Sequence, residues 1–121
     1  MAGHKIDRLT SDFTFQLAGL IRELKDPRVT GCMLSVVRVE ITNDLSYATA
    51  YVGAVEGLEA AKNAVKGLQS ASGYLKRELS ARIKMRKMPE LRFVADDSIE
   101  HSAHIARVLE SLNLQEEKAD D

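Results

Sequence analysis

A Ser-Ala-Ser-Gly run at residues 70–73 interrupts a long helical pattern and so limits how this chain can fold. Apolar residues recur at helical spacing on both sides of the run, at Leu58, Ala61, Val65 and Leu68 before it and at Leu75, Leu79 and Ile83 after it. Glycine within a helix costs about 1 kcal/mol relative to alanine, and serine competes for backbone hydrogen bonds. We therefore predict helices over roughly 58–70 and 73–82, separated by a kink at Ala71-Ser72-Gly73. Such a junction serves packing alone, or presents free N–H groups that attract phosphate, and both interpretations stay open.

Two segments ahead of these helices have the composition and alternation of strands. In the first, Cys32 to Thr42, we expect one side to face the core and the other to face water. The expected core side carries Met33, Ser35, Val37, Val39 and Ile41, and the wet side carries Arg38 and Glu40. The second, Tyr47 to Ala54, places small apolar residues on one face, where a helix can approach closely. The intervening Asn43-Asp44-Leu45-Ser46 is typical of a turn, so the two segments are predicted to form an antiparallel hairpin.

The remaining patterns complete one domain. A first helix is predicted from between Lys5 and Asp12 to Lys25, ended by Asp26-Pro27 because a residue before proline is pushed out of the helical region. Residues 91–94 form a third short strand, and Asp97 with Glu100 resembles a capping pair for a last helix through Leu112. A right-handed crossover makes strands two and three parallel. The prediction is an α+β domain over residues 1–112, with a three-stranded mixed sheet, helices on one face, and a disordered acidic tail at 113–121.

Composition limits the cellular compartments in which we expect this protein. No apolar run approaches the ~20 residues of a membrane span, and the N-terminus lacks a signal-peptide core. The single cysteine, Cys32, excludes an internal disulfide framework and suits a reducing compartment. We therefore expect a cytoplasmic protein with no membrane partner, in which Cys32 is a buried strand thiol.

Charge is distributed unevenly along the chain, although the net charge is only −1. Residues 62–92 hold nine basic and two acidic residues, whereas the remainder holds eight basic and sixteen acidic residues. This asymmetry favours a defined surface that faces a polyanion. The alternative is an ordinary solvated helix face.

Five motifs, in this order and spacing, resemble those of a known family over roughly Lys5 to Leu112. They are Lys25-Asp26-Pro27-Arg28, the hairpin run at residues 39–48, Ala71-Ser72-Gly73-Tyr74-Leu75-Lys76-Arg77, Met88-Pro89-Glu90-Leu91-Arg92-Phe93, and Asp96-Asp97-Ser98-Ile99-Glu100. The element order resembles that of a type II KH-like domain (αββααβ), and the motifs resemble the ribosome-binding factor A family. The N-terminal approach keeps only Lys5 and Arg8 of a usually arginine-rich stretch, and Lys76 stands where the family often has arginine.

The resemblance implies a non-enzymatic assembly factor that binds 16S rRNA in the free 30S subunit. Its implied role is late maturation and processing of the rRNA precursor, above all in the cold, as a monomer without cofactor, metal or small-molecule substrate. KH domains ordinarily clamp nucleotides with Gly-x-x-Gly, which is absent from this sequence. Phosphate contacts to folded RNA are therefore expected instead. The predicted RNA-binding residues are Ser70, Ala71, Ser72, Gly73, Lys76, Arg77, Arg82, Lys84, Arg86 and Lys87.

Two other groups of residues suggest different chemistry. Tyr47, Tyr51 and Tyr74 suit base stacking, but strand and helix packing explains Tyr51 and Tyr74 more simply. The acid and histidine group at residues 96–104 lacks a third nitrogen or sulfur ligand at fixed spacing, so neither a metal nor a catalytic site is predicted. The main alternative function is a small α/β protein-interaction module whose acidic part binds a basic protein.

Overall fold

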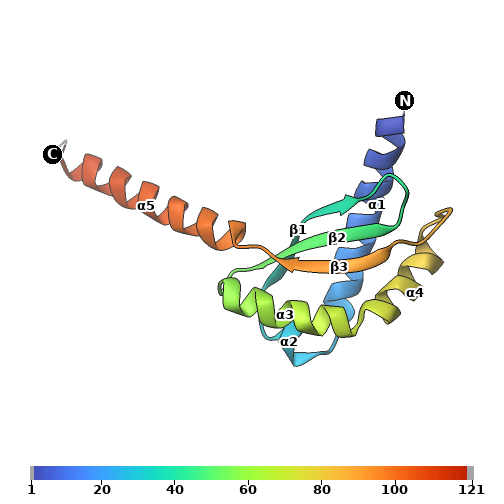
Figure 1. The fold of residues 1–121 in the computed structure, drawn as a ribbon. Helices are drawn as coiled ribbons and strands as arrows, with labels where there is room; N and C mark the ends of the chain where they lie inside the picture. Colours follow the sequence, from blue (N-terminus) through green and yellow to red (C-terminus); the bar gives the residue numbers. More distant parts are fainter. Residues whose placement is uncertain (1, 120–121) are drawn as a thin grey trace.

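Three strands form one mixed sheet, in the order β1-β2-β3, in the computed structural model of the protein. The structure describes residues 2–119, and the side chains of residues 7–99, 101 and 104–112. Its elements are α1 (Ala2–Glu23), α2 (Pro27–Thr30), β1 (Leu34–Ile41), β2 (Tyr47–Ala54), α3 (Leu58–Ser70), α4 (Ser72–Arg82), β3 (Glu90–Ala95) and α5 (Ser98–Ala119). Strand β2 pairs antiparallel with β1 and parallel with β3 (Figure 1). The predicted α+β fold with a mixed sheet is confirmed, and it is consistent with the KH-like class.

The core lies between one face of the sheet and helices α1, α3 and α4. On β2, Ala48, Ala50 and Val52 are buried, as the alternation predicted. The helices contribute the largest buried side chains, among them Phe13, Leu17, Leu20, Leu68, Leu75 and Leu79. The alanines take little space, so the helix side chains reach the sheet backbone closely. This packing fixes α4 against α1 and so positions everything that α4 carries.

A β-bulge in β1 overturns part of the predicted pattern. The register shifts between Val36 and Arg38, which leaves Val37 as the extra residue. Because the bulge reverses the alternation on its N-terminal side, Val36 packs against the core, whereas Met33 and Val37 are 69% and 40% exposed. Ser35 is exposed as well, so the prediction that Met33, Ser35 and Val37 face the core is wrong.

A four-residue helix, α2, follows α1 and was not predicted. Pro27 stands in its first turn, and the Asp26 carboxylate accepts hydrogen bonds from the Arg28 backbone N–H (2.9 Å) and guanidinium (2.7 Å). These bonds lower the pKa of Asp26. The turn after α2 contains Cys32, which is half-buried and precedes β1, so the predicted buried strand thiol is a turn residue instead. Burial, and secondarily Glu56, raise the pKa of its thiol.

The two glycines of the α3–α4 segment have opposite surroundings, which gives a matched test of packing. A Cβ on Gly67 would lie 3.0 Å from Val29 Cγ2 and 3.2 Å from Asp26 Oδ2, whereas a Cβ on Gly73 meets nothing within 4 Å. We expect Gly73→Ala to raise the free energy of unfolding by about 0.5–1 kcal/mol through helix propensity. Gly67→Ala should lower it by about 1 kcal/mol, because overpacking outweighs that gain. Urea unfolding of both variants measures the two changes in the free energy of unfolding. Changes of the same sign would show that α2 shifts to make room for the added methyl group on α3.

The β1–β2 turn contains a carboxylate whose titration should appear in the stability of the fold. Asp44 Oδ1 accepts hydrogen bonds from the Ser46 N–H (3.1 Å) and the Thr42 hydroxyl (2.8 Å). Bonds from Ser46 and then Thr42 lower the pKa of Asp44 from 3.8 to about 2. The unfolded chain binds this proton first as pH falls, so the stabilisation is complete above about pH 4 and is lost between about pH 4 and pH 2. We expect Asp44→Asn to flatten the fall in unfolding free energy over that interval, and identical pH profiles would contradict this.

Helix α5 leaves the sheet at the end of β3 and points away from the rest of the molecule (Figure 1). It continues to Ala119, past the predicted end at Leu112, and the expected disorder of residues 113–121 stays a prediction. In its first turn, the Asp96 carboxylate accepts a hydrogen bond from Ser98 N at 2.7 Å. The Glu100 side chain lies outside the described residues, so the predicted capping pair of Asp97 and Glu100 stays a prediction. No described helix has the length and apolar content to span a bilayer.

Candidate nucleic-acid interface

The predicted kink is present at Ala71. Helix α3 ends at Ser70, Ala71 has φ −90° and ψ 4°, and α4 begins at Ser72. The Ala71 N–H donates to Gly67 O and Leu68 O, both at 3.1 Å, while Ala71 O accepts from Leu75 N at 2.9 Å. The backbone is thus bonded on both sides of the bend. Gly73 lies inside the first turn of α4, one residue later than the helix start.

The side chain of Gln69 fastens the kink to the sheet. Its Nε2 donates to Leu91 O at 3.2 Å, and its Oε1 accepts from Phe93 N at 3.4 Å. These bonds use backbone groups of β3 on the edge that faces the helices. Sequence reasoning missed this residue, because an amide next to a kink gives no sign of the strand it will reach. These two hydrogen bonds therefore fix the position of the kink relative to β3.

The first two turns of α4 present a glycine, an aromatic ring and a guanidinium to solvent. Gly73 and Arg77 are exposed, and Tyr74 is 42% exposed. The Tyr74 ring is thus more accessible than packing alone predicts, and its stacking on a base stays a prediction. Residues three apart on a helix are neighbours, so Tyr74 and Arg77 share this outer side. A ring beside a guanidinium suits base stacking together with phosphate contact.

The six predicted basic residues all lie on α4 or on the linker at residues 83–89 that follows it, and we call them the basic segment. They are Lys76, Arg77, Arg82, Lys84, Arg86 and Lys87. Three of them already have a partner. Lys76 Nζ lies 2.5 Å from Glu90 Oε1, Arg82 pairs with Glu78 at 2.6 Å, and Lys87 donates to Ser46 Oγ at 3.5 Å.

The other three cations, Arg77, Lys84 and Arg86, are exposed and have no ion-pair partner within the described part of the chain. Lys84 lines a hollow of about 380 Å³ between α1 and the end of α4, together with Leu9, Asp12, Gln16, Arg82 and Ile83. Exposed cations without partners retain their full attraction for phosphate. They are the strongest candidates for RNA contact in the predicted set.

Two arginine–tyrosine stacks on the open face of the sheet were also missed. The Arg92 guanidinium lies 3.7 Å from the Tyr47 ring centroid, and the Arg38 guanidinium lies 4.3 Å from that of Tyr51. Tyr51 also donates its hydroxyl to Glu40 at 3.2 Å. The alternating pattern placed both tyrosines on this face, but the partner strands supply the arginines. Here the rings are covered by the protein's own cations.

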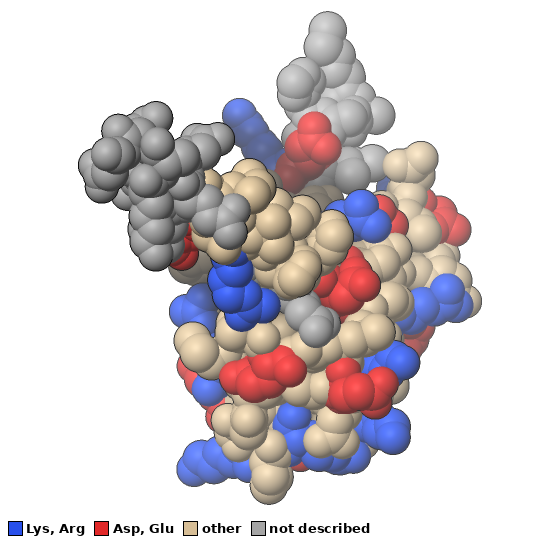
Figure 2. All heavy atoms as spheres, turned by 90° about the vertical axis from the view of Figure 1, so that its left-hand side faces the viewer, with Lys and Arg blue, Asp and Glu red and all other residues tan. Residues whose placement is uncertain are grey.

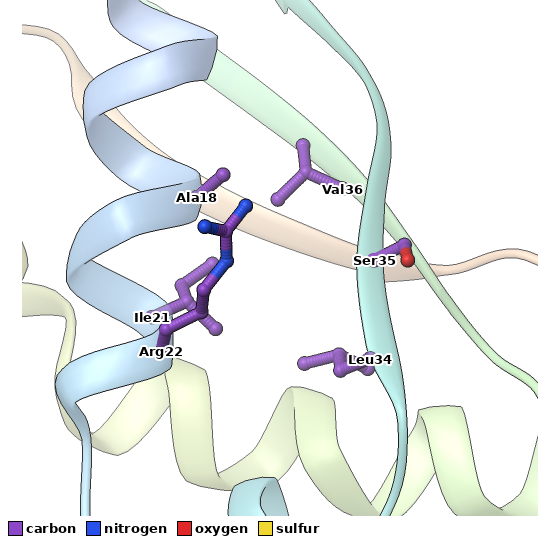
Figure 3. Close-up of a pocket in the computed structure, with 6 residues that line it drawn as sticks. All are labelled: Ala18, Ile21, Arg22, Leu34, Ser35 and Val36. Carbon is purple, nitrogen blue, oxygen red and sulfur yellow. The ribbon is translucent and has the colours of Figure 1, made fainter.

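A hollow of about 280 Å³ between α1 and the edge strand β1 is a separate feature (Figure 3). Its lining is Ala18, Ile21, Arg22, Leu34, Ser35 and Val36, and the Arg22 side chain extends across it. None of the predicted site residues lines it. The lining offers one guanidinium and no carboxylate, imidazole or thiol, so it provides no acid–base pair for catalysis.

Charge on the face from which α5 leaves is mixed. Acidic and basic groups alternate there without a continuous basic surface (Figure 2). The histidines of α5, His101 and His104, are exposed beside Asp97 and Arg107. Among the residues whose side chains are described, no group of three or more His, Cys, Asp or Glu is placed to hold a metal ion.

Sequence comparison gives one consistent result. The family model described as ribosome-binding factor A matches residues 5–109. A ribosome-binding factor A from Clostridium novyi is 38% identical over 122 residues, covering 100% of this chain and 98% of the relative. One from Carboxydothermus hydrogenoformans is 42% identical over 113 residues, covering 93% and 89%.

Solved structures agree with the sequence relatives. The crystal structure of ribosome-binding factor A from Thermus thermophilus superposes with a TM-score of 0.65 at 31% identity, covering 74% of this chain and 92% of that one. A T. thermophilus homology model fitted into the cryo-EM map of a 30S–RbfA complex gives a TM-score of 0.59 at 32% identity, covering 72% and 90%. With the helix–kink–helix and its flanking motifs in place, this chain belongs to the ribosome-binding factor A family.

Proposed function

We propose that this protein binds the 30S ribosomal subunit through 16S rRNA and assists late maturation and processing of the rRNA precursor. Membership of a ribosome-binding family supports subunit binding, as does the relative fitted into a 30S–RbfA map. The observation that carries the RNA contact is the set of unpaired, exposed cations at Arg77, Lys84 and Arg86. Each is free to replace a counterion on a phosphate.

The contact we infer is to folded RNA through its backbone. Ser70 is exposed beside the kink, and Ser72 and Gly73 open the first turn of α4. Without a Gly-x-x-Gly loop, the junction lacks the usual clamp for a single strand. Phosphate contacts position a protein on RNA without reading its bases. Tyr74 adds one stacking contact at the same place.

The cellular role follows from this binding. We infer a monomeric, non-enzymatic cytoplasmic factor that needs neither cofactor nor small-molecule substrate. RNA rearrangements become slow at low temperature, and such a factor matters most under that condition. Its absence should therefore delay precursor processing chiefly in the cold. The alternative, a module that binds only a basic protein, predicts binding without dependence on the basic segment.

Sedimentation with purified 30S precursor particles over a salt series tests the proposal. Three phosphate contacts give a slope of log affinity against log salt of about −2 to −3. We expect co-sedimentation that weakens with this slope, and weaker binding to mature 70S ribosomes as the control. Absence of co-sedimentation, or binding that salt does not change, would contradict the proposal. Footprinting of the rRNA in the same particles then locates the contact.

A further inference from the structure

Helix α5 carries an apolar stripe that the rest of the molecule does not cover. Ile105, Val108, Leu109 and Leu112 follow the i, i+3, i+4, i+7 spacing of one helix face. Their exposed fractions are 44%, 44%, 56% and 50%, and none of them packs against the described core. Such a stripe on a globular protein is normally buried against another element. Here the helix points away from the sheet, so the element that would bury it is not part of the described body (Figure 1).

The base of α5 is fixed, so the stripe is held at a distance from the body. Ile99 lies over Gly53 of β2, where a Cβ would come within 2.9 Å of Ile99 Cδ1, and Asp96 bonds the first turn through Ser98 N. Only glycine leaves room for Ile99 at this point. At about 1.5 Å per residue, Leu112 lies roughly 20 Å along the helix from Ile99. Helix α5 is therefore attached to the body by its first turn and holds the apolar stripe away from it. We call this helix the arm.

The charge of the arm distinguishes it from the RNA-facing surface. Helix α5 holds four acidic residues and two basic ones, Arg107 and Lys118, and two more acidic residues, Asp96 and Asp97, directly precede it. The basic segment precedes β3 and the arm follows it, so the two are separated by the length of that strand, about 20 Å. An acidic arm is repelled by phosphate and does not extend the RNA contact. It is complementary to a protein surface rich in lysine and arginine.

A second copy of this chain is a poorer occupant. Four aliphatic side chains on two helical turns fall well short of the about 800 Å² per partner that a stable dimer buries. Two such arms would also bring like charges together. A short amphipathic helix instead fits a preformed apolar groove, where a few anchors at this spacing suffice.

We propose that α5 docks by its apolar stripe into a groove on a basic protein of the small-subunit precursor, while the basic segment contacts the rRNA. This inference rests on the proposed function, because the subunit supplies both partners. It assigns the acidic arm to a protein and the basic segment to the rRNA of the same particle.

Photo-crosslinking tests which component the stripe touches. Benzoylphenylalanine in place of Leu109 probes the stripe, and the same probe in place of Glu110, 100° around the helix, is the matched control; both are placed in the full chain bound to 30S precursor particles. We expect the Leu109 probe to give an adduct with a basic protein, at several times the yield of the Glu110 probe. An adduct with rRNA, with this chain itself or with a second copy would overturn the proposal, as would equal yields or no adduct.

A pair of double variants separates this contact from the proposed function. Val108→Ser with Leu109→Ser removes the centre of the stripe, and Arg107→Ser with Ser111→Ala alters the opposite side. We expect the first to bind precursor particles about tenfold more weakly with an unchanged salt slope, and the second to bind normally. Equal binding by both with the salt slope intact overturns the docking and leaves the rRNA contact standing. Failure of the unaltered chain to bind overturns the proposed function, and the docking with it.

Discussion

A chain in which Arg77, Lys84 and Arg86 are replaced by glutamate will bind 30S precursor particles at least about 100-fold more weakly than the unaltered chain. Each replacement removes an unpaired, exposed cation and puts a negative charge near phosphate. A hydrogen bond to a charged group contributes about 1.5–3 kcal/mol, so losing even two of the three reaches this factor. The slope of log affinity against log salt, which is negative, should become less steep by about 2 to 3. Sedimentation at several salt concentrations measures both quantities.

The matched control makes the same charge change elsewhere. Lys25, Lys62 and Lys66 are also exposed, and none of them is among the predicted RNA-binding residues, although Lys62 pairs with Glu59 at 3.5 Å. Their replacement by glutamate gives the same net charge, so it reports any general repulsion from the particle. We expect a loss of less than tenfold. Equal losses in the two triple variants would mean that overall charge, and not the surface on α4 and its linker, governs binding.

The paired cations of the basic segment should matter less. Lys76 and Arg82 already have carboxylate partners in Glu90 and Glu78, and binding RNA would require these bonds to break or be shared. The bond from Lys76 also lowers the pKa of Glu90, which keeps that partner ionised at neutral pH. The sequence pattern predicted no ion-pair partner for any of the six residues. The structure ranks them, because the partners of Lys76 and Lys87 are 14 and 41 residues away along the chain.

Patterns that the backbone imposes were visible in the sequence. β2 and α3 begin and end at the predicted residues, because each keeps an unbroken period of two or 3.6 over its whole length. The period of β1 is broken, because one extra residue at Val37 exchanges the two faces of the strand. No particular residue type marks such a bulge, so the sequence pattern does not predict it. The outward position of α5 was equally hidden. Its apolar spacing predicts a helix with something to cover it, but not whether the cover belongs to this chain.

The exposure of Tyr74 marks the same limit at the candidate site. On α4 it lies one residue from the fully buried Leu75, and a helical pattern cannot say how far α1 extends over that edge. The kink itself was predictable because serine and glycine weaken helices locally. Its attachment through Gln69 was not, because that depends on where β3 returns. Local chemistry was therefore predictable, and long-range partners were not.

The adjacent residues Tyr74 and Leu75 should separate binding from stability. Leu75 is 0% exposed between α4 and the core, whereas the Tyr74 ring is 42% exposed. Leu75→Ala should lower the free energy of unfolding by about 3 kcal/mol, from lost burial and the cavity left behind. Tyr74→Ala should change it by no more than about 0.5 kcal/mol. Urea denaturation of both variants measures these values.

Binding should show the reverse order. Under conditions in which Leu75→Ala remains folded, its cations are intact, so its affinity for precursor particles should fall by less than threefold. Tyr74→Ala should bind at least about fivefold more weakly, since stacking of one base on an aromatic ring contributes about 1–3 kcal/mol. Tyr74→Phe keeps the ring and should bind like the unaltered chain. If Tyr74→Ala binds normally, the ring contacts no base, and the junction acts through phosphates alone. If Tyr74→Phe is as weak as Tyr74→Ala, the hydroxyl rather than the ring makes the contact.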